Sequence, residues 1–121
     1  MKLQTATRNV GEVAVVDCRG RIVLGDETAE LRQLVRNLIG LSPRIVLNLT
    51  QVNHIDSNGI GMLVGLYVAA KNANAAIKLA GLVDHVRSVM ETTRLSTIFE
   101  TYNTVEEAVA SFAAVPVAKA G

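Results

Sequence analysis

The apolar residues of this chain follow two spacings, and each spacing predicts a different kind of element. Residues 13–18 are rich in β-branched side chains and end near Gly20, which predicts a strand followed by a turn. A short strand at 3–7 is expected to pair with it across a turn at 9–11. A brief strand is also expected at 21–23, so the chain opens with consecutive strands.

Helical spacing follows these strands, beginning at Asp26 as the expected N-cap. Apolar residues then recur at intervals of three and four: Leu31, Leu34, Val35 and Leu38. Gly40 comes next, where a residue in the left-handed conformation commonly ends a helix. This pattern predicts an amphipathic helix with its charged residues outside.

A nearly continuous apolar run at 44–49 follows Pro43 and predicts the central strand of a sheet, because such runs are typical of strands buried on both faces. The remaining pattern predicts helices at 57–72 and 82–92 and strands at 76–80 and 98–99. Thr104 and Glu107 have the spacing of a capping box, which predicts a last helix running to about Phe112.

Strands near the N-terminus, followed by helices and strands in alternation, predict an α/β fold with about four helices packed on a mixed β-sheet. The chain has 121 residues, enough to bury roughly two-thirds of the surface of its unfolded form in a conventional core. No internal repeat or linker is present, so we expect a single domain over 1–113 and a flexible tail over 114–121.

Composition argues against several classes of function. Lys and Arg number 12 against 11 Asp and Glu, without a dense basic run, so neither nucleic acid nor an anionic membrane is favoured as a partner. Cys18 is the only cysteine, which excludes an intramolecular disulfide, and no metal or cofactor motif is recognisable. The longest uncharged stretch, 57–70, is too short to cross a bilayer. We therefore expect a cytoplasmic protein without membrane insertion, metal or cofactor.

The most informative segment is 55–61, which reads Ile-Asp-Ser-Asn-Gly-Ile-Gly at an expected strand-to-helix junction. Ser57 begins a helix that carries no charge until Lys71, and the positive end of a helix dipole stabilises an added phosphate. Phosphorylation would place about −1.5 to −2 charges beside that uncharged surface. The alternative is structural: Ser57 or Asp56 serves only as the N-cap.

One face of this helix is expected to bury against the sheet. The other face is covered either within the domain or by a partner, and we favour the partner because the domain is small and has one sheet layer. A helical wheel places Ile60, Leu63, Val64 and Tyr67 on the buried face. The opposite face then carries Asn58, Met62, Gly65 and Ala69, whereas a solvated face normally carries charges. The methionine suits such a contact because its side chain adapts to the surface it meets. Gly59 and Gly61 could belong to a phosphate-binding loop, but the chain lacks the lysine and the third glycine of such a loop. A better explanation is that the missing side chains let another backbone approach closely.

A serine hydrolase is the catalytic alternative. His54, three residues before Ser57, is the nearest candidate base, but the Gly-X-Ser-X-Gly elbow and a third orienting group are absent. His85, beside Asp84, is expected to be a solvated residue in a first helical turn. The residues therefore favour a protein that is not an enzyme.

The run from 44 to 61 resembles the core of STAS domains, specifically the bacterial anti-sigma factor antagonists. Four further segments resemble the flanking parts of these domains: 20–26, 77–82, 95–99 and 104–108. The resemblance thus covers nearly the whole chain, and its most specific part is the Asp-Ser-X-Gly-X-Gly motif at 56–61. Three positions depart from the family pattern. Asn58 replaces a common Ser or Thr, His54 replaces an apolar or aromatic residue, and Ile60 replaces the commoner Leu, which is a mild change.

This resemblance implies a partner switch. The unphosphorylated domain binds an anti-sigma factor, which is also a serine kinase of the histidine-kinase-like ATPase fold, and thereby frees a sigma factor. The kinase phosphorylates the motif serine, here Ser57, the antagonist dissociates, and a PP2C-type phosphatase restores it. The expected partner-binding residues are Asp56, Ser57, Asn58, Gly59, Gly61, Met62, Gly65 and Ala69, in a monomer or weak dimer.

Two other hypotheses stay open at this point. The chain could be a STAS scaffold within a larger assembly, stressosome or transporter-associated, in which the same helix face is permanently buried. It could also be a small serine enzyme, which would require turnover that depends on His54.

Overall fold

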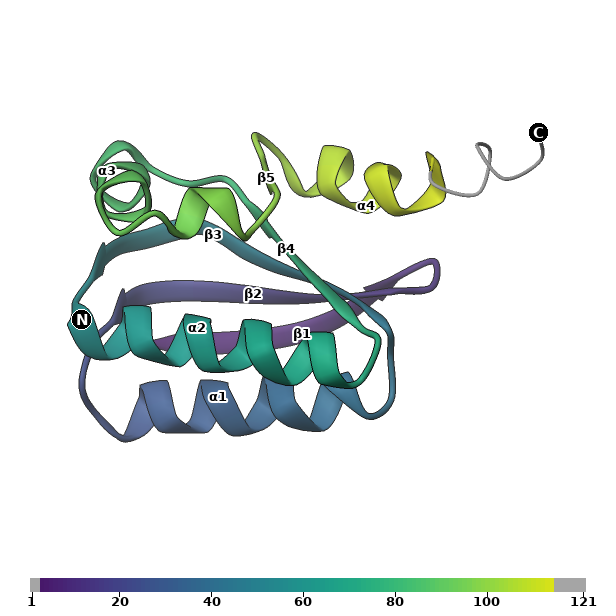
Figure 1. Cartoon of the computed structure of the whole chain (residues 1–121), viewed down its shortest axis with the longest axis horizontal. Helices are drawn as coiled ribbons and strands as arrows, with labels where there is room; N and C mark the ends of the chain where they lie inside the picture. Colours follow the sequence, from purple (N-terminus) through teal and green to yellow (C-terminus); the bar gives the residue numbers. More distant parts are fainter. Residues whose placement is uncertain (1–2, 115–121) are drawn as a thin grey trace.

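The computed structural model describes residues 3–114 and shows a five-stranded mixed sheet with four α-helices, so the predicted α/β fold class is confirmed (Figure 1). The elements in chain order are β1 (Gln4–Val10), β2 (Val13–Ile22), α1 (Asp26–Ile39), β3 (Arg44–Ile55), α2 (Ser57–Asn72), β4 (Ala76–Ala80), α3 (Asp84–Thr92), the 3₁₀ helix η1 (Leu95–Thr97), β5 (Thr101–Tyr102) and α4 (Val105–Ala114).

The strands lie side by side in their sequence order, β1-β2-β3-β4-β5. β1 and β2 form an antiparallel hairpin that turns at Gly11 and Glu12, where Gly11 has a φ of 61°. The other three pairs are parallel, and each of the three connections between parallel strands contains an α-helix. β3 is confirmed as the central strand, and it extends beyond the predicted run to Ile55.

The brief separate strand expected at 21–23 is wrong, because β2 continues through Gly20 to Ile22. The register between β2 and β3 shifts twice, between Asp17 and Arg19 and between Gly20 and Arg21. Gly20 has a φ of 115°, so the glycine that indicated a turn instead permits an irregularity inside a long strand.

Two core clusters lie on opposite faces of the sheet. Val16, Ile45 and Leu47 pack with α1, α2 and α3, and all three residues are fully buried. Val15 and Val46, their neighbours in the chain, pack with Ala108 and Phe112 of α4, as the alternation of side chains along a strand requires. α1 and α2 therefore run side by side over one face, while α4 covers part of the other (Figure 1).

Several predicted helix ends need correction. Asp26 is the first helical residue and Gly25 is the N-cap, while Gly40 has a right-handed φ of −77° because its N–H bonds back to the last turn of α1. α3 begins at Asp84, two residues later than predicted. The strand expected at 98–99 is wrong: the chain there follows η1, and the short pairing with β4 is made by β5.

The end of the domain agrees with the capping-box prediction in part. The Thr104 hydroxyl accepts a hydrogen bond from the Glu107 N–H at 3.1 Å, whereas the Glu107 carboxylate accepts from Asn103 rather than from Thr104. α4 continues to Ala114, the first residue of the expected tail, and the remainder of that tail lies outside the described residues.

Candidate functional site

Asp56 joins two segments of the chain at the start of α2. Its Oδ1 accepts hydrogen bonds from the backbone N–H groups of Asn58 at 2.9 Å and Gly59 at 3.0 Å, so Asp56 is the N-cap. Its Oδ2 accepts from the N–H of Leu24 at 3.1 Å, which ties the β2–α1 loop to the same point. These hydrogen bonds lower the pKa of Asp56 because they favour the ionised carboxylate, and the bond from Gly59 contributes most.

Ser57 is the first residue of α2, and it is exposed. Because Asp56 supplies the capping oxygens, Ser57 is not the N-cap, and its hydroxyl is not used in the cap. A phosphate on this hydroxyl would lie at the positive end of the α2 dipole, where negative charge is stabilised. The sequence left open whether Ser57 or Asp56 is the N-cap of α2, and the structure assigns that role to Asp56.

Gly59 has no side chain, which lets the first turn of α2 lie close to the end of β2. A Cβ at this position would collide with the carbonyl oxygen of Ile22 and lie 2.8 Å from Ile55 Cγ1. The expected close approach of a neighbouring backbone is therefore real at Gly59, which is buried. At Gly61 and Gly65 a Cβ would meet nothing within 4 Å, so both face open space.

The exposed face of α2 is rotated relative to the prediction. Met62 is only 7% exposed, whereas Val64 is 38% and Val68 is 50% exposed, so the expected positions of Met62 and Val64 are wrong. The buried residues are Gly59, Met62, Leu63, Leu66 and Ala70. α2 is apolar on nearly all sides, so its hydrophobic pattern alone does not define the buried face. The close contact of Gly59 with β2 determines which side of the helix faces the core.

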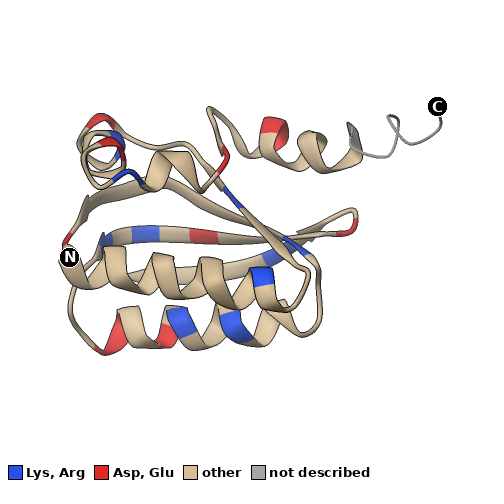
Figure 2. Cartoon of the chain, viewed as in Figure 1, with Lys and Arg blue, Asp and Glu red and all other residues tan. Residues whose placement is uncertain are grey.

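An uncharged outer face nevertheless exists on α2. Its exposed members are Ser57, Asn58, Gly61, Val64, Gly65 and Val68, while Ala69 is half-buried. Figure 2 shows α2 without charge along most of its length, beside an α1 that carries both signs. Of the expected partner-binding residues, Gly59 and Met62 belong to the packed side of the helix, and the others lie on or beside its outer face.

A groove of about 430 Å³ runs between α1 and α2. Its α2 side includes Ser57, Asn58, Gly61, Met62 and Gly65, which are all predicted site residues. Its α1 side includes Arg32 and Arg36, and Leu24 of the preceding loop lies at its edge, 75% exposed. The sequence shows that Arg32 and Arg36 share a helix face, but the adjacency of α1 and α2 comes only from the structure.

His54 is not arranged as a base for Ser57. Its Nδ1 lies 3.2 Å from Nε2 of His85, so one ring donates a hydrogen bond to the other. His85 is exposed, as expected, but it is engaged with His54 rather than only solvated. Cys18 offers no alternative nucleophile, since burial raises the pKa of its thiol to about 12.

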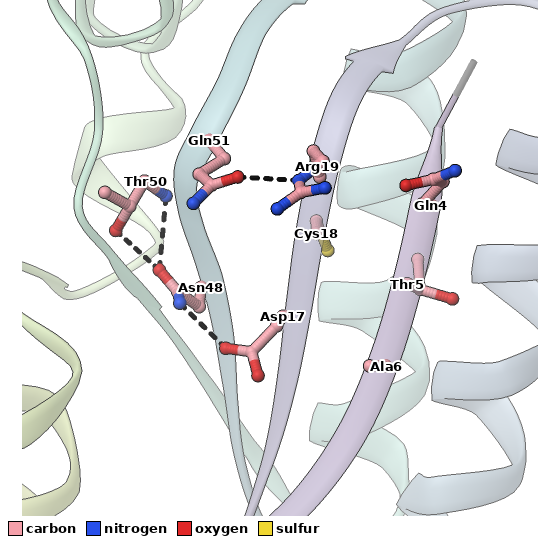
Figure 3. Close-up of a pocket in the computed structure, with 9 residues that line it drawn as sticks. All are labelled: Gln4, Thr5, Ala6, Asp17, Cys18, Arg19, Asn48, Thr50 and Gln51. Carbon is pink, nitrogen blue, oxygen red and sulfur yellow. Dashed lines mark hydrogen bonds between the residues drawn. The ribbon is translucent and has the colours of Figure 1, made fainter.

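A larger hollow, of about 680 Å³, lies away from Ser57 on the sheet (Figure 3). Its polar side chains bond mainly to one another, with Asn48 donating to Asp17 at 2.8 Å and Arg19 donating to Gln51 at 2.7 Å. A bidentate ion pair with Arg8, supported by Asn48, lowers the pKa of Asp17. None of the residues that line this hollow also lines the groove between α1 and α2.

Residues 3–114 contain neither a candidate metal site nor a helix that could span a membrane. No cluster of three or more His, Cys, Asp or Glu side chains could hold a metal ion there. No helix in that range combines the length and hydropathy required to span a bilayer.

The chain is a small α/β protein in which Asp56 caps α2 and leaves Ser57 exposed at the start of that helix. The chain belongs to the STAS domain family, because the family model for the STAS domain matches residues 4–108. An anti-sigma-B factor antagonist of Listeria monocytogenes is 35% identical over 57 residues, which are 47% of this chain and 50% of that protein. The chain therefore spans about half the length of the curated relatives it matches.

Solved structures share the fold over most of the chain. An anti-sigma factor antagonist from Mycobacterium paratuberculosis has a TM-score of 0.78 at 21% identity and covers 91% of this chain and 93% of its own. The unphosphorylated antagonist SpoIIAA has a TM-score of 0.72 at 18% identity, covering 93% and 100%. Its phosphorylated Bacillus form has the same TM-score at 20% identity, covering 90% and 99%. At these identities the likeness shows the STAS fold.

Proposed function

We propose that this chain is an anti-sigma factor antagonist whose binding to an anti-sigma factor kinase is controlled by phosphorylation of Ser57. The observation that carries the proposal is the exposed Ser57 at the first position of α2, beside an outer helix face without charge. The relatives named above include anti-sigma factor antagonists, and SpoIIAA has been solved in both its unphosphorylated and its phosphorylated form.

The geometry supports a binding surface that a single modification can reverse. Asp56 fixes the start of α2 and the β2–α1 loop, so Ser57 is presented on a rigid element. A partner packed on Gly61, Val64 and Gly65 would meet a neutral surface. A phosphate would add about −1.5 to −2 charges at its edge, which costs binding energy if the partner carries negative charge or buries that edge. A PP2C-type phosphatase would restore binding.

The test uses the Ser57→Ala variant as bait in the native organism, followed by reconstitution with the kinase that it captures. The purified kinase and ATP should phosphorylate the wild-type chain but not Ser57→Ala. Ser88→Ala is the matched control, because Ser88 is also exposed but lies on α3. Mass spectrometry of the intact chain and of its peptides gives the site directly.

Three outcomes would contradict the proposal. Phosphorylation that survives in Ser57→Ala places the modification elsewhere. A partner that stays bound to Ser57→Asp identifies a permanent assembly, as in a scaffold, rather than a switch. Turnover of an ester or phosphate substrate that disappears in His54→Ala would show an enzyme instead.

A further inference from the structure

The groove between α1 and α2 has two chemically different sides. Gly61 and Gly65, one helical turn apart on α2, leave space in which a Cβ would meet no other atom within 4 Å. Opposite them, Arg32 and Arg36 are exposed and also one turn apart on α1. A neutral side that permits close backbone approach thus faces a side with two guanidinium groups. In Figure 2 the basic positions of α1 lie beside the uncharged part of α2.

Neither arginine finds a counter-charge in its own helix. The positions three and four residues from Arg32 and Arg36 hold no acidic residue, and the two arginines stand four residues apart from each other. Like charges at that spacing destabilise a helix. The ion pairs within residues 3–114 use other groups: Arg8 with Asp17, Arg44 with Glu12 and Lys78 with Glu100. Among residues 3–114, neither arginine of the groove is therefore paired with a carboxylate, and both are available to an external acidic group.

We infer that this groove receives a helix of the partner that carries two carboxylates one turn apart, paired with Arg32 and Arg36. This inference rests on the proposed function, since the helix belongs to the anti-sigma factor kinase. Carboxylates at i and i+4 of a helix have the same axial separation as the two arginines. The small surface of Gly61 and Gly65 lets the axis of that helix approach α2 closely, while the guanidinium groups reach its acidic side.

The same arrangement gives Ser57 its place in the switch. Ser57 lines the end of this groove, beside Leu24 and Asn58. A phosphate there would face the negative charge of the acidic helix at close range, and charges of like sign across an interface oppose binding. Phosphorylation then acts through repulsion within the groove, in addition to any steric effect.

The experiment measures the dissociation constant of the captured kinase with the unphosphorylated chain at two salt concentrations. Arg32→Gln/Arg36→Gln should weaken binding about tenfold at low salt, and its affinity should depend less on salt than that of the wild type. Lys71→Gln/Arg94→Gln is the matched control, because it removes the same charge from exposed residues outside the groove. The control should bind within about twofold of the wild type.

The outcomes separate this inference from the proposed function. If the kinase binds and phosphorylates Ser57 but the groove variant keeps wild-type affinity, the acidic helix is refuted and the switch stands. An equal loss in the Lys71→Gln/Arg94→Gln control also refutes it, because net charge then explains the effect. If the groove variant instead abolishes self-association measured by sedimentation, a second copy occupies the groove. If no kinase binds the wild-type chain, both proposals fail together.

Discussion

His54 and His85 are joined by a hydrogen bond that links the carboxyl end of β3 to the first turn of α3, with Nδ1 and Nε2 3.2 Å apart. Their ring planes differ by only 6°, and their centroids lie 5.1 Å apart, so the two nitrogens face each other between the rings. The bond directs the His54 side chain toward α3, although His54 precedes Ser57 by only three residues in the chain.

Removing either ring should cost the same small amount of stability. We expect His54→Ala and His85→Ala each to lower the free energy of unfolding by about 0.5–1.5 kcal/mol, the net value of one hydrogen bond. The double variant should cost little more than either single variant, because both remove the same bond. Urea unfolding of the four proteins measures this coupling, and simple additivity would show that the rings act independently. The rate of Ser57 phosphorylation should stay unchanged in His54→Ala.

Gly59 and Gly61, two residues apart and therefore on opposite sides of α2, should respond differently to substitution by alanine. Gly59→Ala is expected to lower the free energy of unfolding by about 1–3 kcal/mol, since its Cβ would collide with Ile22. Gly61→Ala should leave stability unchanged or raise it by up to about 1 kcal/mol, because its Cβ meets open space and alanine favours helix. Urea midpoints measured in parallel test both; equal destabilisation would contradict the orientation of α2.

The sequence predicts α2 with its observed bounds but not its orientation. Periodicity and flanking polar residues are local properties, so Ser57 and Asn72 are found as its ends. The side that faces the core depends on how Gly59 meets Ile22, a contact between residues far apart in the chain. Since Met62 and Val64 are both apolar, no local signal distinguishes the buried one from the exposed one.

The same limit applies to the sheet and the groove. Gly20 is read locally as a turn, yet its positive φ is used inside β2, where pairing with β3 keeps the strand intact. Arg32 and Arg36 are correctly expected on the outside of a helix. Their relation to Ser57 arises because two successive parallel connections, β2–α1–β3 and β3–α2–β4, place α1 beside α2. Tertiary packing therefore decides which exposed residues form one surface.

Stability at acid pH should depend on the ion pair between Arg8 and Asp17, whose Nε and Oδ2 are 2.8 Å apart. The pair lowers the pKa of Asp17 below its value of about 3.9 in the unfolded chain. A depressed pKa stabilises the fold above the unfolded value, and the contribution is lost as pH falls through the folded pKa. Arg8→Gln should therefore be less stable at pH 7 by at most about 1 kcal/mol, since both side chains are partly exposed.

The difference between wild type and Arg8→Gln should shrink as pH falls from about 5 to 2, because protonated Asp17 no longer attracts the guanidinium. Urea midpoints across this range measure the convergence. Asp17→Asn is the control, since it removes the same charge from the other side of the pair and should flatten the same part of the profile. A difference that persists unchanged at the lowest pH would assign the effect of Arg8 to packing.

Lys78 is a buried cation beneath α4, and its stem and its charge should contribute very unequally to stability. Its Nζ donates to Ser111 Oγ at 2.7 Å, lies 3.2 Å from a Glu100 oxygen and sits 4.2 Å from the centroid of the Phe112 ring. Lys78→Met keeps most of the stem and removes the charge. The carboxylate that loses its partner is on Glu100, which is 65% exposed, so no buried charge is left unpaired and we expect a change within about 1 kcal/mol.

Lys78→Ala should instead cost about 2–4 kcal/mol, because it opens a cavity between β4 and Phe112. The Lys78→Met variant is tolerated because its former partners keep other contacts. Ser111 also donates to the carbonyl of Ala108 at 2.6 Å, and Glu100 is 65% exposed, so neither is left buried and unpaired. Urea unfolding compares the two variants, and hydrogen exchange of the α4 amides localises the effect. If Met proved as damaging as Ala, the ammonium group and its bonds, rather than the packed stem, would be what holds α4 on the sheet.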